Sequence, residues 1–198
     1  MPTVLITAFD AYGHWQQNSS WLTLVELTRS LPDRPTVTTR RYPVDYQAMR
    51  DRLAADLKGN YDYAIHLGQA PGHGRIELEA VGLNVAGTHE QMPDEFDVLS
   101  DDGPVAYRTD LPLADWAAKI RRAGIPCQVS YHAGTFLCNA TLYLSHLLAE
   151  QNSLTTRPVF VHLPLEVSQA LTESKDVATM PATTMAAAIR LILDELAE

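Results

Sequence analysis

Cysteine is scarce in this chain of 198 residues, which contains only Cys127 and Cys138. Two cysteines are too few for a disulfide framework, and their separation does not match the ligand spacing of a zinc finger. We therefore expect both residues to be free thiols in a reducing compartment.

Basic residues are also few. Fifteen Lys and Arg residues stand against 24 Asp and Glu residues, which gives a formal net charge of −9 and a pI near 5.2. Nucleic-acid phosphates and anionic membrane surfaces both require clustered Lys and Arg. This charge balance predicts that the partners are neither nucleic acids nor membranes.

Long hydrophobic runs and nucleotide-binding motifs are missing as well. No apolar stretch approaches the roughly 18 residues of a membrane-spanning helix, and the N-terminus lacks the basic segment and apolar core of a signal peptide. Neither G-x-G-x-x-G nor G-x-x-x-x-G-K-[ST] occurs, so nothing supports a nucleotide, flavin or haem cofactor. We expect a cytoplasmic protein that uses no cofactor.

The composition is that of an ordinary globular protein, with 46% hydrophobic and 20% charged residues. The length favours a single domain over residues 1–198. Apolar runs typical of buried strands alternate with segments of helical periodicity. We expect strands at 3–9, 36–42, 61–67, 127–131 and 158–163, and helices at 18–31, 46–57, 113–122, 138–148 and 181–196.

Strands that alternate with helices predict a three-layer α/β/α sandwich around a mostly parallel twisted sheet, a hydrolase- or phosphorylase-like fold. Residues 76–85 alternate between apolar and polar and are expected to be extended, and 87–103 form a polar loop or lid. Ligands of such sheets gather at the carboxyl ends of strands. The loops at 9–14, 68–79 and 132–139, together with His162, are therefore the candidate site.

Cys138 is the candidate nucleophile, because it lies where a helical pattern begins. The first turn of a helix offers free backbone N–H groups and the positive end of the helix dipole, and both favour a thiolate. The same N–H groups can hold an oxyanion. The alternative is a small core residue, which is also what we expect of Cys127 on its strand.

His162 lies at the end of an apolar strand, in R-P-V-F-V-H-L-P. A histidine fixed in this way can serve as a general base and then as a general acid, although a structural histidine would give the same pattern. Glu79 lies among apolar residues, where a carboxylate needs a partner such as an imidazole. Glu77 shares the same strand face, and the residues alone do not decide between the two acids.

The remaining histidines show no metal-ligand spacing. His66 lies within a strand, His146 lies on a helix, and four others lie in loops: His14, His73, His89 and His132. Phe9 and Tyr12 flank the loop after the first strand. They are either core residues or the walls of a flat apolar slot for a small ring.

Taken together, these segments resemble the pyroglutamyl peptidase I (pyrrolidone-carboxylate peptidase) family of cysteine peptidases. A-G-T-F-L-C-N at 133–139 is similar to the family's nucleophile segment, V-F-V-H-L-P at 159–164 to its histidine segment, and I-E-L-E-A-V-G-L-N at 76–84 to its acid segment. H-L-G-Q-A at 66–70 and the opening V-L-I-T-A-F-D-A-Y-G also match. The resemblance covers nearly the whole chain.

The resemblance implies a Cys138–His162–Glu79 triad, with Glu79 preferred because it stands five residues before Asn84. It implies removal of N-terminal pyroglutamate (5-oxoproline) from peptides or small amides through a thioester, without metal or cofactor. It also implies a homotetramer or homodimer. The substrate would be bound by five residues: Phe9, Tyr12, Gln69, Phe136 and Leu137.

The chain also departs from the pattern of the family it resembles. The departures are Ala8 for Gly, Tyr12 for Phe, Glu77 for Ser or Thr, Ala80 for a basic residue, Gly82 for Ala, Gln91 for Arg, and His132 for a small residue. They leave two alternatives open: a related cysteine amidase with a different small acyl or lactam substrate, and a non-catalytic homologue that binds a small ligand.

Overall fold

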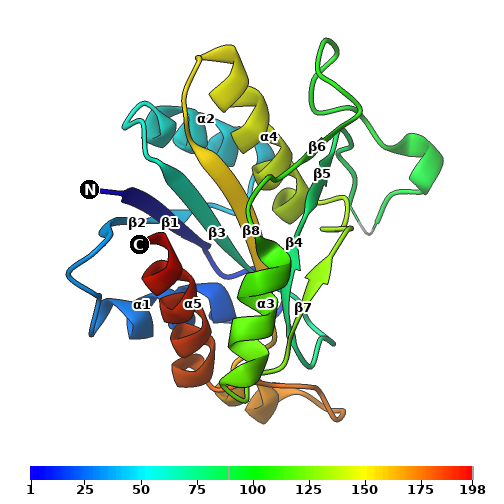
Figure 1. Ribbon diagram of the computed structural model, residues 1–198. Helices are drawn as coiled ribbons and strands as arrows, with labels where there is room; N and C mark the ends of the chain where they lie inside the picture. Colours follow the sequence, from blue (N-terminus) through cyan, green and yellow to red (C-terminus); the bar gives the residue numbers. More distant parts are fainter. Residues whose placement is uncertain (89, 198) are drawn as a thin grey trace.

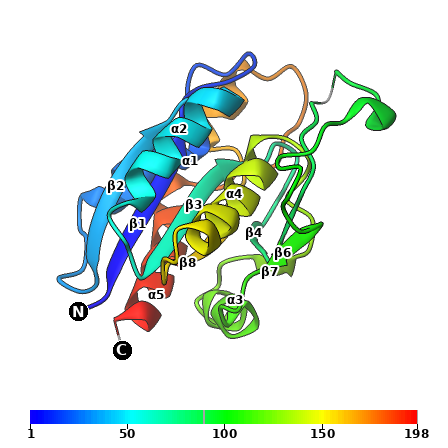
Figure 2. The ribbon, with the colours of Figure 1, turned by 90° about the horizontal axis from the view of Figure 1, so that it is seen from above.

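The computed structural model describes residues 1–88 and 90–197, arranged in three layers (Figures 1 and 2). The central layer consists of β1 (Thr3–Phe9), β2 (Thr36–Tyr42), β3 (Tyr63–Gln69), β4 (Ile76–Glu79), β7 (Cys127–Ser130) and β8 (Arg157–Leu163). They form one six-stranded sheet in the order β2-β1-β3-β8-β4-β7. The predicted α/β/α sandwich is confirmed.

Helices cover both faces of the sheet (Figure 2). One face carries α1 (Ser19–Thr28), α3 (Leu113–Arg122) and α5 (Ala182–Leu196), and the other carries α2 (Tyr46–Leu57) and α4 (Leu137–Gln151). Two short 3₁₀ helices, η1 (Pro93–Glu95) and η2 (Val167–Thr172), lie in connecting segments. All five predicted helices are present.

Burial on both faces explains why the central strands read as continuous apolar runs. In β1, Val4 and Ile6 pack into the core under α1 and α5, whereas Leu5 packs into the core under α2 and α4. Successive side chains of a strand point to opposite faces. Polar residues fix the helix starts, since the Asn18 side chain accepts from Ser20 N and Asp45 from Ala48 N.

Two strands run in the direction opposite to the other four, which differs from the expected mostly parallel order. β1, β2, β3 and β8 are parallel, but β4 runs antiparallel to β8, and β7 follows the direction of β4. Residues 76–79 therefore reach the site from the opposite direction to the neighbouring strand. An additional two-stranded sheet, β5 (Val81–Leu83) with β6 (Ala106–Arg108), was not predicted as a pair.

The segment between β5 and β6 carries η1 and extends away from the main sheet, on the right of Figure 1. Side chains anchor its base. Asn84 Oδ1 accepts from Leu99 N and Ser100 N at 2.9 and 3.0 Å. Asn139, on α4, bonds to both the N–H and the carbonyl of Leu83. The predicted loop at 87–103 is thus tied to the helix that carries Cys138.

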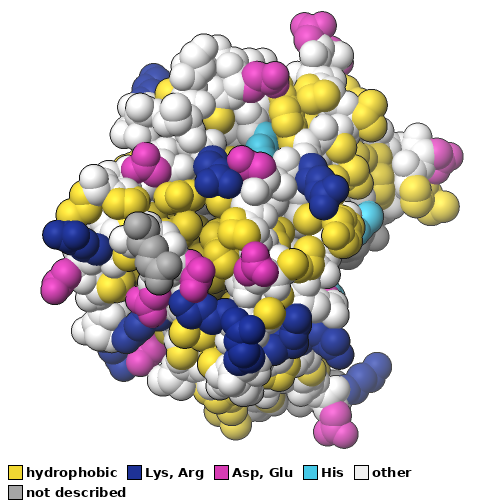
Figure 3. Space-filling model, in the orientation of Figure 1, with side chains coloured by type: hydrophobic (Ala, Val, Ile, Leu, Met, Phe, Trp, Pro, Cys, Tyr) yellow, Lys and Arg dark blue, Asp and Glu magenta, His cyan; other side chains and the backbone are white. Residues whose placement is uncertain are grey.

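Acidic and basic side chains are intermixed on the face of the molecule shown in Figure 3. Several basic side chains gather low on this face, in the region of α3, whose last turn holds Lys119, Arg121 and Arg122. Cations at this position interact favourably with the negative end of the helix dipole. Within residues 1–88 and 90–197, no helix combines the length and apolarity needed to cross a membrane.

Candidate active site

Cys138 is the second residue of α4, on the face of the sheet that α2 and α4 cover. Gly134, with φ at +77°, allows the left-handed turn before the helix, and Phe136 is extended at the N-cap. The N–H groups of a first helical turn have no acceptor within the helix. They surround the half-buried Cys138 with donors at the positive end of the helix dipole.

His162 is the penultimate residue of β8, and Glu79 is the last residue of β4. The Nδ1 atom of His162 lies 2.7 Å from Oε1 of Glu79. Glu79 is fully buried, and His162 is 8% exposed. The charge of the Cys138 sulfur also acts on this imidazole and favours its protonated form. Residues from β4, α4 and β8 that are distant in sequence therefore bring an acid, an imidazole and a thiol together.

The charges around His162 favour its protonated form. Burial alone would lower the pKa of His162, but the negative Cys138 thiolate, with its hydrogen bond, and the Glu79 carboxylate outweigh burial and raise this pKa to about 10. Cys127 has the opposite character. It is buried in the core on β7, and burial raises its pKa to about 12, which suits the predicted core residue.

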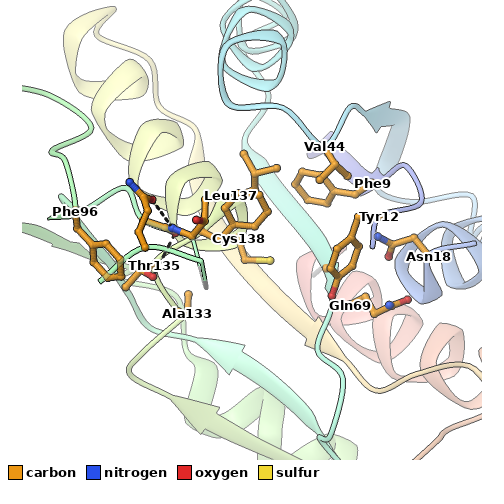
Figure 4. Close-up of a pocket in the computed structure, with 16 residues that line it drawn as sticks. Phe9, Tyr12, Asn18, Val44, Gln69, Phe96, Ala133, Thr135, Leu137 and Cys138 are labelled. Carbon is orange, nitrogen blue, oxygen red and sulfur yellow. Dashed lines mark hydrogen bonds between the residues drawn. The ribbon is translucent and has the colours of Figure 1, made fainter. Parts of the chain in front are cut away.

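Cys138 opens onto a cavity of about 370 Å³ (Figure 4). Five segments contribute to its walls, and apart from the Cys138 sulfur they contain no Asp, Glu, Lys, Arg or His among the described lining residues. They are Phe9, Tyr12, Asn18, Val44, Gly68, Gln69, Gly87, Thr88, Gln91, Phe96 and residues 133–138. An apolar cavity with a few polar groups is typical of a small-ligand site.

The five candidate substrate-binding residues all line this cavity. Phe9 is also 4% exposed and packs edge-on against Tyr42, so it serves the core and the cavity together. Gln69 Oε1 accepts from Ser19 N at 2.7 Å and from Gln169 Nε2 at 2.8 Å, which fixes its amide. Tyr12 lies above Gln69 in Figure 4, and burial raises its pKa to about 12.

A group of potential metal-binding atoms also lies here, since Glu77, Glu79 and His162 bring ligand atoms within 4.8 Å of one another. These side chains are already engaged with protein partners. His162 Nδ1 is bonded to Glu79, and Glu77 is bonded to His73 and Gln128. The arrangement therefore fits a hydrogen-bonded acid–imidazole system better than a metal centre.

The chain is similar to known proteins over nearly its whole length. The family model described as pyroglutamyl peptidase matches residues 2–198. The chain belongs to the pyroglutamyl peptidase family. The pyrrolidone-carboxylate peptidase of Bacillus cytotoxicus is 34% identical over 98% of this chain and 92% of its own length. That of Bacillus subtilis is 33% identical over 95% of this chain and 89% of its own.

Solved structures of the family share the fold. The pyrrolidone carboxyl peptidase of Fervidobacterium islandicum AW-1 matches with a TM-score of 0.93 and 31% identity, covering 99% of this chain and 98% of that chain. The Bacillus amyloliquefaciens pyroglutamyl peptidase I matches with a TM-score of 0.88 and 27% identity, covering 98% and 95%. The resemblance predicted from the sequence is confirmed.

Several cavity residues were not predicted from the sequence. Val44 lies after β2, and Gly87, Thr88 and Phe96 lie in the loop that was predicted only as a polar loop or lid. The aromatic Phe96 within an acidic stretch was the available signal. Gln91, noted as a departure, lines the cavity, and its Oε1 accepts from Thr88 N at 2.9 Å. His89 lies outside the described residues.

The remaining histidines have structural partners or lie apart from the cavity. His66 is fully buried between Thr7 Oγ1 and Ser145 Oγ, each 2.8 Å from a ring nitrogen. His14 lies 2.7 Å from Glu173. His132 is exposed, and its Nδ1 accepts from Gly134 N in the turn before α4.

Proposed function

We propose that this chain is a cysteine exopeptidase that removes N-terminal pyroglutamate from peptides. The observation that carries the proposal is the grouping of Glu79, His162 and Cys138 beside a largely apolar cavity. We also propose that residues 1–198 act as one catalytic domain in the cytoplasm, without a cofactor. A dimer or tetramer remains a prediction from the family.

In the first half of the reaction, the Cys138 thiolate attacks the pyroglutamyl carbonyl carbon and forms a C–S bond. Backbone N–H groups at the start of α4 stabilise the resulting oxyanion. The His162 imidazolium then donates its proton to the departing amine nitrogen as the C–N bond breaks. The truncated peptide leaves with a neutral amine, and the acyl group stays on sulfur as a thioester.

In the second half, neutral His162 takes a proton from water, and the hydroxide attacks the thioester carbonyl. The C–S bond breaks, pyroglutamate leaves, and the thiolate–imidazolium pair is restored. Glu79 remains a carboxylate throughout. Its role is to orient the imidazole through Nδ1 and to stabilise the imidazolium.

The cavity explains the preference for a lactam. A free N-terminal ammonium would lose its hydration in a cavity that offers no Asp or Glu carboxylate among its described lining residues, and this burial would be costly. The pyroglutamyl ring has no such charge, and it presents only one N–H and one C=O. Phe9, Phe136 and Leu137 offer apolar walls, while Gln69 Nε2 has no acceptor among the described residues and suits the lactam carbonyl.

The test is hydrolysis of pyroglutamyl-7-amido-4-methylcoumarin, with the prolyl and glutaminyl amides as comparison substrates. We expect turnover of the pyroglutamyl amide only, abolished in Cys138→Ala and retained in Cys127→Ala, a matched removal of the other thiol. Turnover that survives Cys138→Ala would refute the nucleophile. Preference for another amide would favour the related amidase, and no turnover of any amide would favour the non-catalytic homologue.

A further inference from the structure

A second acid–imidazole pair lies beside the first. His73 Nδ1 is 2.8 Å from Glu77 Oε2, and the ring centroids of His73 and His162 are 6.4 Å apart. Glu77 is directly opposite His162 in the ladder between β4 and β8. Residues paired in this way present their side chains on the same face. Accordingly, a carboxylate oxygen of Glu77 lies within 4.8 Å of ligand atoms of both Glu79 and His162.

The carboxylate of Glu77 is fixed at this place. Its side chain is only 12% exposed. One oxygen contacts His73, and the other accepts from Gln128 Nε2, whose residue is its neighbour in the ladder between β4 and β7. A carboxylate with little solvent around it exerts a stronger field on its neighbours than one in water, and the two partners hold it in place.

None of the catalytic steps described above uses Glu77. Building on the proposed function, we propose that Glu77 is a positioning residue, a second fixed negative charge that acts with Glu79 to hold His162 in its protonated form beside Cys138. In this arrangement, His73 and Gln128 position Glu77 in the same way that Glu79 positions His162.

The groups that face His162 set the direction of the expected effect. Among the described residues they are Cys138 from α4, Glu77 and Glu79 from β4, and His73 from the loop before β4, while the Phe160 ring lies 5.0 Å away. A nearby negative charge favours the imidazolium. Its removal makes His162 lose its proton at lower pH, so the alkaline limb of the activity profile moves downward.

The experiment compares wild type with Glu77→Gln, which removes the charge, Glu77→Asp, which keeps it, and Asp51→Asn, which removes a charge from the exposed side of α2. The pH dependence of kcat/KM and of Cys138 alkylation by iodoacetate is measured for each, because this anion reacts fastest with the thiolate while the neighbouring imidazolium is still protonated. We expect the alkaline limb of Glu77→Gln to move down by roughly one pH unit. The Asp51→Asn limb should match wild type, and that of Glu77→Asp should return toward it.

An unchanged limb in a folded Glu77→Gln variant overturns the proposal, as does a Glu77→Asp variant that behaves like Glu77→Gln. If Glu77→Gln does not fold, His73→Ala takes its place. Loss of the imidazole donor leaves the carboxylate charge less compensated, so the limb should move upward, and a limb at the wild-type position overturns the proposal.

Alkylation requires no peptide substrate, so it separates the two proposals. A shifted alkylation limb in Glu77→Gln, combined with no wild-type turnover of any pyroglutamyl substrate, would refute the proposed function and support the role of Glu77. Normal wild-type turnover of the pyroglutamyl substrate, combined with an unshifted limb in Glu77→Gln, would support the proposed function and refute the role of Glu77.

Discussion

Glu79 illustrates how much a single buried carboxylate can determine. One of its oxygens is 2.7 Å from His162 Nδ1, and the other has no hydrogen-bond partner among the described residues. The acid therefore directs its strongest interaction at the imidazole. This contact selects the tautomer with a proton on Nδ1 and leaves the other nitrogen for the sulfur of Cys138.

Substitution Glu79→Gln tests this role with almost no change in shape. The neutral amide no longer stabilises the imidazolium, and it can stabilise the wrong tautomer, so we expect kcat/KM to fall by roughly 10²–10⁴-fold. The measurement is steady-state hydrolysis of the pyroglutamyl coumarin amide, with melting temperature as the check on folding. A fall of less than about tenfold in a folded variant would contradict an orienting role.

The choice between Glu77 and Glu79 shows where residue-scale sequence reasoning ends. Alternation along a strand places both carboxylates on one face, and it does so without specifying the neighbouring strand. In the structure, Glu77 is directly opposite His162 and Glu79 is opposite Phe160, yet Glu79 is the acid that bonds to the imidazole. Diagonal neighbours across two strands are close enough for long side chains to meet. The strand register alone would pair His162 with Glu77, so only the side-chain geometry identifies Glu79 as its partner.

At the scale of elements, hydrophobic periodicity predicted the helices and the central strands because each has a core on at least one face. The helix predicted at 113–122 matches α3 (Leu113–Arg122). Periodicity carries no information on strand direction, so the antiparallel β4 was not foreseen. The three-residue β6 is too short to show a period, and 22 residues (84–105) separate it from its partner β5.

Gly68 allows β3, β8 and α4 to pack closely where they meet. A Cβ at this position would lie 2.4 Å from the Phe160 ring and 3.1 Å from Cys138 Sγ. Gly68→Ala should therefore cost about 1–3 kcal/mol of unfolding free energy through overpacking, and it should reduce kcat/KM by displacing the sulfur. Urea denaturation and steady-state kinetics measure the two effects.

Gly74 provides the matched control, because a Cβ there would meet only Ala178 Cβ, at an ordinary 3.8 Å. We expect Gly74→Ala to change stability by less than about 0.5 kcal/mol. If Gly68→Ala and Gly74→Ala were equally stable, the close packing around Gly68 would not limit the side chain that β3 can carry at this position.

At the scale of the whole molecule, buried histidines connect the sheet to α4. Ser145 Oγ donates to Thr141 O at 2.7 Å, so it accepts from His66 Nε2, while His66 Nδ1 accepts from Thr7 Oγ1. His66 is thus satisfied as a neutral ring. Burial, reinforced by the nearby His146, lowers its pKa to about 3, and burial also lowers the pKa of His146 to about 4.

The lowered pKa of buried His66 predicts that the fold becomes less stable in acid. In the unfolded chain a histidine takes up a proton near pH 6.5, whereas folded His66 resists protonation down to about pH 3. Between these values the unfolded state binds more protons, so the contribution of His66 to stability is complete above pH 6.5 and is lost progressively as the pH falls toward 3. Each such proton lowers the unfolding free energy by about 1.4 kcal/mol per pH unit.

Urea denaturation of wild type and His66→Gln at pH 7, 6, 5 and 4 measures this contribution. We expect the variant to be less stable at pH 7, because it loses the fit between Thr7 and Ser145, and to have a shallower dependence on pH. The difference between the two proteins should therefore shrink as the solution becomes more acidic. Parallel curves would mean that acid unfolding is governed by other groups, and that the buried link between β1, β3 and α4 does not set the lower pH limit of the fold.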